Sequence, residues 1–243
     1  MITRVLPSIL AGALSLAAAP SAFSVTLLFD LGSGGTPTAA PTNNITDAQA
    51  PIANATDTAG NSTSISVTTS GFNGSNTTGT LAPTGSAGAI FSTTYTQDSL
   101  YGNTGVFNNV SRPVATMVFS GLDGSGATVY TFDFFASRTG VSDIRETEYN
   151  LAGAGSPSSV FLDASNNTSN VVTSAGIIPT AGGTITLTVD AGPNNNNGTG
   201  TDPTRFYYLG ALRVTTAPVP EPSIFGLLVL SGAALMRRRR TTC

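Results

Sequence analysis

The chain has 243 residues and a formal net charge of −3, with no histidine, no tryptophan and one cysteine. This composition excludes Ser-His-Asp and Cys-His catalysis, the usual zinc sites and an intramolecular disulfide. Between residues 25 and 217, five arginines stand against twelve carboxylates, which leaves a net charge of about −7 and disfavours nucleic-acid binding.

Residues 1–24 have the pattern of a secretory signal peptide. Arg4 precedes the apolar run from Ile9 to Ala19, and Ala22-Phe23-Ser24 supplies the small residues that precede a cleavage site. We therefore expect export, with cleavage after Ser24. The exported body, residues 25–217, is long enough to form one domain with its own core and no disulfide.

Thr, Ser, Asn and Gly alternate with apolar residues along the body, and runs of strong helix formers are missing. This pattern predicts an all-β domain. In chain order, we expect strands at Val25–Asp30, Ile65–Thr69, Ala89–Thr94, Val114–Ser120 and Thr128–Ser137. A further strand would place Ile185, Leu187 and Val189 on one face. The last strand would do the same for Phe206, Tyr208, Leu212 and Val214. About eight to ten short strands with turns between them predict a single β-sandwich or jelly roll.

Two stretches of the body have the composition of loops. Residues 32–62 are rich in Gly, Thr, Pro, Ala and Asn with few large apolar side chains, which predicts a long irregular loop. Asn194–Asn197 is expected to form an exposed loop between two strands.

The stretch Tyr130–Asn150, the Asn194–Asn197 loop and FYYLGAL at 206–212 together resemble a galactose-binding-like β-sandwich domain of secreted bacterial proteins. The resemblance implies a jelly roll and contact with glycans. It brings no fixed functional residues with it, so binding residues must be argued from their chemistry.

Carboxylates are the main catalytic groups that the composition leaves. Glu146 and Glu148 are two apart on an expected strand, so they would share a face roughly 7 Å apart, near the spacing of a glycosidase acid and base. A solvated patch in which they pair with Arg138 or Arg145 explains the same alternation, and it is the interpretation we favour. Glycosidase carboxylates also usually face each other from different strands.

Tyrosines are the candidate groups for stacking on a sugar ring, and Tyr207 joins Glu146 and Glu148 as the candidate ligand-binding set. The other candidates are Tyr101, Tyr130 and Tyr208, of which Tyr130 and Tyr208 are also expected to pack in the core. No cofactor is expected, with a structural calcium ion as the alternative. Asp and Asn oxygens suit that ion, and two groups could supply them: Asp190, Asn194 and Asp202, or Asp163, Asn166 and Asn167. Neither spacing matches a defined calcium loop, and turn formation explains the same residues.

The last 26 residues, PVPEPSIFGLLVLSGAALMRRRRTTC, combine a stiff break, an apolar run and a basic end. Pro220 and Pro222 prevent regular helix, which can begin near Ser223. The thirteen residues Ile224–Met236 would give a helix of roughly 20 Å, shorter than the ~30 Å hydrocarbon core. Four arginines, Arg237, Arg238, Arg239 and Arg240, favour a cytoplasmic anchor under the positive-inside rule.

This tail resembles the PEP-CTERM sorting signal of Gram-negative bacteria through the residues Val219, Pro220, Glu221, Pro222 and Ser223 and the helix and arginines that follow. The resemblance implies an exosortase-type sorting enzyme as partner, a precursor anchored in the inner membrane, and a destination at the cell surface or outside the cell. We expect segments at 1–24, 25–217 and 218–243. Two functions stay open: a non-catalytic surface or matrix protein with affinity for extracellular polysaccharide, or a carbohydrate-active enzyme that uses Glu146 or Glu148.

Overall fold

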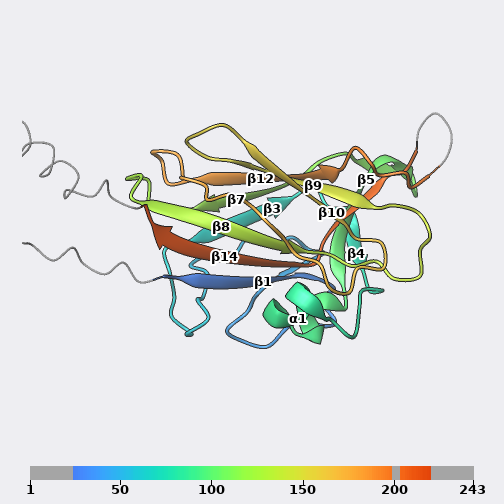
Figure 1. The fold of residues 1–243 in the computed structure, drawn as a ribbon, viewed down its shortest axis with the longest axis horizontal. Helices are drawn as coiled ribbons and strands as arrows, with labels where there is room; N and C mark the ends of the chain where they lie inside the picture. Colours follow the sequence, from blue (N-terminus) through green and yellow to red (C-terminus); the bar gives the residue numbers. More distant parts are fainter. Residues whose placement is uncertain (1–23, 199–202, 220–243) are drawn as a thin grey trace, which may run out of the picture.

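The computed structural model describes residues 24–198 and 203–219. They form a sandwich of two five-stranded sheets with a smaller third sheet at one end (Figure 1). The all-β sandwich expected from the sequence is confirmed. The expected signal-peptide and C-terminal helices lie outside the described residues. Within the described ranges, no helix is long and apolar enough to cross a membrane.

The first sheet contains both the first and the last strand of the body. Its strands are β1 (Thr26–Gly32), β2 (Asn43–Thr46), β8 (Thr128–Phe135), β11 (Val172–Thr173) and β14 (Ala211–Pro218), in the order β11-β8-β14-β1-β2. β1 and β14 are antiparallel neighbours, and β2 runs parallel to β1. Both ends of the described chain therefore leave from the same end of the sandwich (Figure 1).

The second sheet consists of β3 (Ser66–Ser70), β7 (Ala115–Ser120), β9 (Glu146–Ala152), β10 (Ser158–Asp163) and β12 (Ile185–Ala191), in the order β10-β9-β12-β7-β3. Buried and partly exposed residues alternate along β7 and β9. One face therefore lies in the core and the other faces outward, as expected for an antiparallel sheet.

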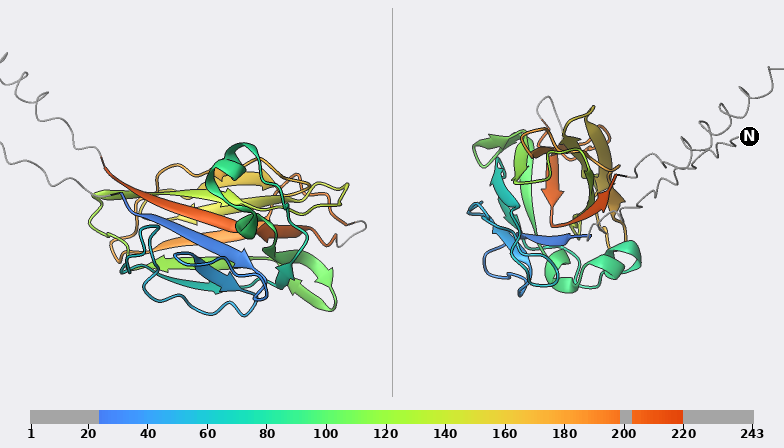
Figure 2. Two further views of the ribbon diagram at one scale, coloured as in Figure 1. Left: turned by 90° about the horizontal axis from the view of Figure 1, so that it is seen from below. Right: turned by 90° about the vertical axis from the view of Figure 1, so that its left-hand side faces the viewer.

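The third sheet closes the end of the sandwich opposite the chain ends. It contains β4 (Gly74–Asn76), β5 (Ser99–Phe107) and β13 (Phe206–Leu209) in the order β13-β5-β4, and β6 (Val110–Arg112) pairs with β5. Two short helices, α1 (Gly85–Ile90) and α2 (Thr93–Thr96), cover the outer face of the first sheet beside β1 (Figures 1 and 2).

Aromatic side chains link the two large sheets through the core. Phe119 of β7 contacts Phe29 of β1 with ring centroids 5.9 Å apart and Phe132 of β8 at 5.3 Å, both edge-on. Phe134 of β8 stacks on Tyr149 of β9 at 4.4 Å. These separations lie close to or within the range in which aromatic pairs add to the stabilisation that burial provides.

Three expectations about the strands were wrong. Ala89–Thr94 is not a strand, because this region contains the end of α1 and the start of α2. Phe91, the C-cap of α1, and Tyr95 of α2 pack on Phe135 and Ala211. Residues 32–62 are not entirely irregular, since they contain β2 and the buried Ile45. The expected last strand is two strands in different sheets, β13 and β14, because Gly210 interrupts the run.

One close packing contact in the third sheet gives a testable prediction. Gly102 lies opposite Tyr207 in the β5–β13 pairing, and a Cβ on Gly102 would stand 2.0 Å from the Tyr207 hydroxyl oxygen. Because the Tyr207 side chain is fully buried, it cannot swing away. We expect Gly102→Ala to lower the free energy of unfolding by about 1–3 kcal/mol through overpacking, as measured by urea unfolding. Gly155→Ala is the matched control, because a Cβ there meets nothing within 4 Å.

Candidate functional site

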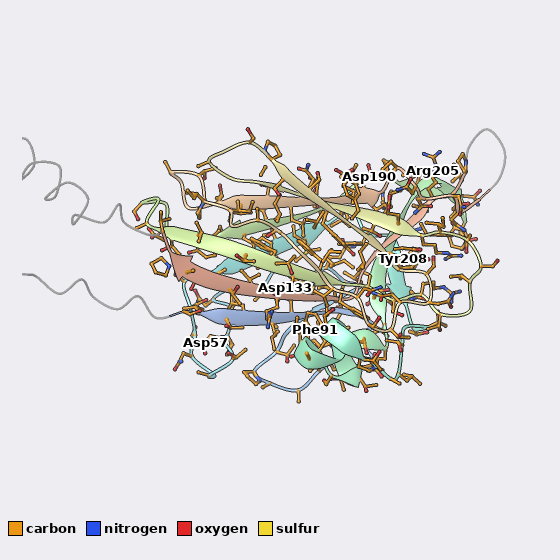
Figure 3. The ribbon with its side chains drawn as sticks, viewed as in Figure 1. Asp57, Phe91, Asp133, Asp190, Arg205 and Tyr208 are labelled. Atoms are coloured by element: carbon orange, nitrogen blue, oxygen red, sulfur yellow. The ribbon has the colours of Figure 1, made fainter. Side chains whose placement is uncertain are left out.

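A groove of about 420 Å³ opens on the third sheet, at the end of the molecule opposite the chain ends. Figure 3 shows Tyr208, which lines it, at that end. We call it the aromatic groove and define it by its lining residues: Ser75, Asn76, Thr77, Thr78, Tyr101, Phe107, Arg138, Arg145, Phe206 and Tyr208. The residues come from β4, β5, β13 and the loops beside them.

Strand alternation places the four aromatic rings of the groove together. Phe206 and Tyr208 are two apart on β13, so they share a face, and Tyr208 pairs directly with Tyr101 on β5. The Phe107 and Phe206 rings meet edge-on with centroids 4.9 Å apart, and Tyr101 meets Phe206 at 5.6 Å. Tyr101, Phe107 and Phe206 remain partly exposed. The result is an apolar surface held in shape by ring-on-ring contacts.

Arg145 forms one wall of the groove and is fixed from several sides. Its guanidinium carbon lies 5.5 Å from the centroid of Phe206 and 5.9 Å from that of Tyr208, within cation–π range. Its Nη1 donates to the Tyr208 hydroxyl, and its Nε lies 3.2 Å from Asp143 Oδ2. Burial raises the pKa of Asp143, but hydrogen bonds from Arg145 and Asn197 outweigh it, so the pKa of this carboxyl falls below its ordinary value.

The groove therefore combines flat apolar rings with hydrogen-bond donors at their edges. Arg138 and Arg145 bring two positive charges, of which Asp143 balances one. Ser75, Thr77 and Thr78 add hydroxyl groups to the lining. Such a surface suits a ligand with an apolar face and a polar periphery, which is the chemistry of a pyranose ring. A catalytic carboxylate is not among the lining residues.

The two glutamates predicted from the sequence lie on the outer face of β9, away from this groove. Glu146 accepts hydrogen bonds from the backbone N and the side-chain Nδ2 of Asn194, at 2.9 and 3.0 Å. Glu148 accepts from Ser159 Oγ at 2.6 Å and lines a separate hollow with Val114, Asn150, Thr188 and Asp190. That hollow has no aromatic lining residue, and neither glutamate lines the aromatic groove.

The four candidate tyrosines separate into core and groove residues. Tyr207 is fully buried and donates to the Arg112 carbonyl at 2.6 Å, so its role as a ligand-binding residue was wrong. The absence of a side chain on Gly102 makes room for its ring in the core. Tyr130 is also buried, and its hydroxyl accepts from Asp123 N. Tyr101 and Tyr208 line the groove, and sequence reasoning missed Phe107 altogether.

The predicted calcium ligands have other contacts in the described part of the chain. Asn194 donates its side-chain amide to Glu146, while Asp190 lies in the hollow with Glu148. Asp202 lies outside the described residues. Asp163 Oδ1 accepts from the backbone N of Arg145 and of Ser165, a turn-forming role. Among described residues, no three His, Cys, Asp or Glu side chains gather as metal ligands would.

The predicted sorting segment begins where the first sheet ends. Val219 donates its backbone N to Ala127 O at 2.8 Å, next to the end of β14. Pro220 to Ser223 and the four arginines lie outside the described residues. The chain thus enters the tail at the end of the sandwich farthest from the aromatic groove (Figure 1).

In comparisons with known proteins, no family model and no curated protein matches the chain. Two solved structures show weak likeness. One is TmCBM61 in complex with β-1,4-galactotriose, 12% identical, with a TM-score of 0.26 over 51% of this chain and 72% of that chain. The other is an exo-β-1,3-galactanase from Phanerochaete chrysosporium with galactose, 15% identical, with a TM-score of 0.24 over 65% of this chain and 31% of that chain. At TM-scores this low, neither likeness bears on the function of this chain.

Proposed function

We propose that this protein is an exported, non-catalytic surface or matrix protein that binds extracellular polysaccharide through the aromatic groove. The observation that carries the proposal is the juxtaposition of Tyr101, Phe107, Phe206 and Tyr208 with Arg138 and Arg145 in one open groove. The partly exposed rings of Tyr101, Phe107 and Phe206 would stack on the C–H face of a sugar, with Tyr208 packed behind them. The guanidinium and hydroxyl groups would bind the sugar hydroxyls.

The proposed route to the surface is the C-terminal segment from residue 218 onward. Its Val-Pro-Glu-Pro-Ser motif, short apolar run and four arginines support sorting by an exosortase-type enzyme at the inner membrane. Because β14 finishes at the end of the sandwich opposite the groove, an anchored precursor would present the groove away from the membrane. The proposed segments remain 1–24 for export, 25–217 for binding and 218–243 for sorting.

The experiment that tests binding compares two phenylalanines. The full chain is screened on a glycan array, and affinity for the best ligand is measured by titration calorimetry. Phe206→Ala removes the ring that contacts both Phe107 and Tyr101. We expect roughly a 10- to 100-fold loss of affinity, as for a central aromatic anchor.

Phe161→Ala is the matched control, because Phe161 is a 42% exposed phenylalanine on β10, outside the groove. Its affinity should equal that of the wild type. Equal affinity for both variants, or no binding to any glycan, contradicts the proposal. Release of reducing sugar that Glu148→Gln abolishes would instead establish the enzyme.

A further inference from the structure

A polar cluster lies on the outer face of the first sheet. It consists of buried carboxylates and shares no residue with the aromatic groove. Asp30 of β1 and Asp98, which precedes β5, are 3% and 2% exposed. A Cβ on Gly32 would lie 2.3 Å from Asp98 Cγ, so the Asp98 carboxylate rests on the bare Cα of Gly32. Gly32 and Asp30 are two apart on β1 and share a face. The two buried carboxylates are therefore neighbours.

The loop after β1 holds one oxygen of each carboxylate in place. Asp98 Oδ2 accepts hydrogen bonds from Ser33 N at 2.8 Å and Thr36 Oγ1 at 2.7 Å. Asp30 Oδ2 accepts from Thr38 N at 2.9 Å. Both side chains are thus oriented by hydrogen bonds to the same short loop.

The remaining oxygens of this cluster have no such partners. Asp30 Oδ1, Asp98 Oδ1 and Thr38 Oγ1 are buried and make no hydrogen bond with any described residue. A buried polar atom without a partner costs about 1–3 kcal/mol, and more when it is charged. Buried polar atoms in folded proteins almost always have a hydrogen-bond partner, so three without one in the same cluster point to a ligand.

No positive charge in the described residues balances this pair. The ion pairs found there join Arg145 to Asp143 and Arg213 to Asp133. Burial raises the pKa of Asp30 to about 6, although Thr38 favours its charged form, and Asp98 adds a smaller upward effect. Burial likewise raises the pKa of Asp98. Buried charges without a partner of opposite sign are strongly unfavourable.

We propose that Asp30 and Asp98 bind a calcium-type divalent cation through their Oδ1 atoms, with Thr38 Oγ1 as a third ligand. All three donors are hard oxygens, the ligands that calcium prefers, and waters or backbone carbonyls would complete its six to eight positions. Calcium fits better than magnesium, because magnesium demands a regular octahedron and keeps most of its waters. The hydrogen bonds to both Oδ2 atoms are the outer contacts that orient ligating carboxylates.

This ion would join the loop after β1 to the segment between α2 and β5. It is a different site from the Asp190, Asn194 and Asp202 group expected from the sequence. It is also independent of the aromatic groove, so loss of glycan binding would not test it.

The test measures calcium binding and thermal unfolding of the full chain, purified in detergent. Titration calorimetry should find a site for one Ca²⁺ per chain that Asp98→Asn and Gly32→Ala both abolish, the second by placing a Cβ where the Asp98 carboxylate rests. Removal of calcium with EGTA should lower the unfolding temperature of the wild type by about 5–10 °C relative to saturating calcium. Neither variant should respond to EGTA.

Asp57→Asn is the matched control, since Asp57 is outside this cluster, at the base of a turn. Figure 3 shows it at a distance from Phe91, the C-cap residue of α1. It should bind calcium as the wild type does. If a variant fails to fold, the site is tested in the wild type by Tb³⁺ luminescence excited through tyrosine. Tyr95 lies near Asp30, so it would transfer energy to an ion bound there. Tyr95→Phe should therefore weaken the signal. No bound calcium and no EGTA effect, or binding that persists in Asp98→Asn, would overturn the proposal.

Discussion

Replacing Tyr149 with alanine is expected to lower the free energy of unfolding by about 3–5 kcal/mol, the usual cost of truncating a large buried aromatic side chain. Tyr149 is fully buried on β9, and its ring stacks on Phe134 of the opposite sheet at 4.4 Å with an interplanar angle of 3°. The variant removes this contact between the sheets and leaves a cavity. Urea unfolding followed by circular dichroism measures the loss.

The hydroxyl group of Tyr149 makes a separate contribution that phenylalanine reveals. It donates to the Tyr208 carbonyl at 2.7 Å, and burial raises its pKa, so the donor proton is retained at neutral pH. Tyr149→Phe keeps the stacking but leaves that carbonyl without its donor, at a cost of about 1–3 kcal/mol. Phe161→Ala, at an exposed position, should change stability by less than about 0.5 kcal/mol. Equal effects of the alanine and phenylalanine variants would contradict a role for the ring stack.

The strands of the core were predictable, because burial on one face imposes a period of two. Val114–Ser120 and Thr128–Ser137 correspond to β7 and β8, and Ile185, Leu187 and Val189 all lie buried on β12. Tyr130, Phe132 and Phe134 on β8 are likewise buried. Alternation of this kind is a local signal, so a single sequence contains it.

The short helices were not predictable from the same signal. Phe91 and Tyr95 are separated by four positions, and their ring centroids lie 5.8 Å from each other. Both rings pack against the outer face of the first sheet. Each helix spans six residues or fewer, too short for helical periodicity to emerge from a Thr-rich stretch. Tertiary packing on Phe135 decides their conformation, and the local sequence does not.

On β13 only Tyr207 was assigned to the wrong environment. Tyr208 was expected in the core and is 2% exposed, whereas Tyr207 was expected to face a ligand and is fully buried. Alternation alone cannot say that both faces of FYYL are covered. The deciding contact is Gly102, far away in the sequence, where a missing side chain admits the Tyr207 ring. The cluster of Asp30 and Asp98 depends on a fold-level contact in the same way, since β1 and β5 meet only in the folded protein.

Deleting residues 224–240 is expected to move the protein from the membrane fraction to the medium. The deletion removes the apolar run Ile224–Met236 and the four arginines, which together are the proposed membrane anchor and cytoplasmic stop. It leaves the described body intact, including the β1–β14 pairing that ends at Thr215 and the Val219 contact with Ala127. Cell fractionation and immunoblotting of both proteins measure the change.

The matched control is a deletion of Thr241–Cys243, which shortens the same end but keeps the apolar run and the arginines. This protein should stay with the membrane to the same extent as the full chain. The separate parts of the signal can then be ranked: replacing the four arginines with glutamine keeps the apolar length but removes the charge that fixes orientation, so retention should fall without disappearing. Because roughly 20 Å of helix is too short to span the hydrocarbon core comfortably, the charge is expected to carry much of the anchoring. Membrane association that survives deletion of 224–240 would place the anchor elsewhere and remove the tail from the proposed sorting route.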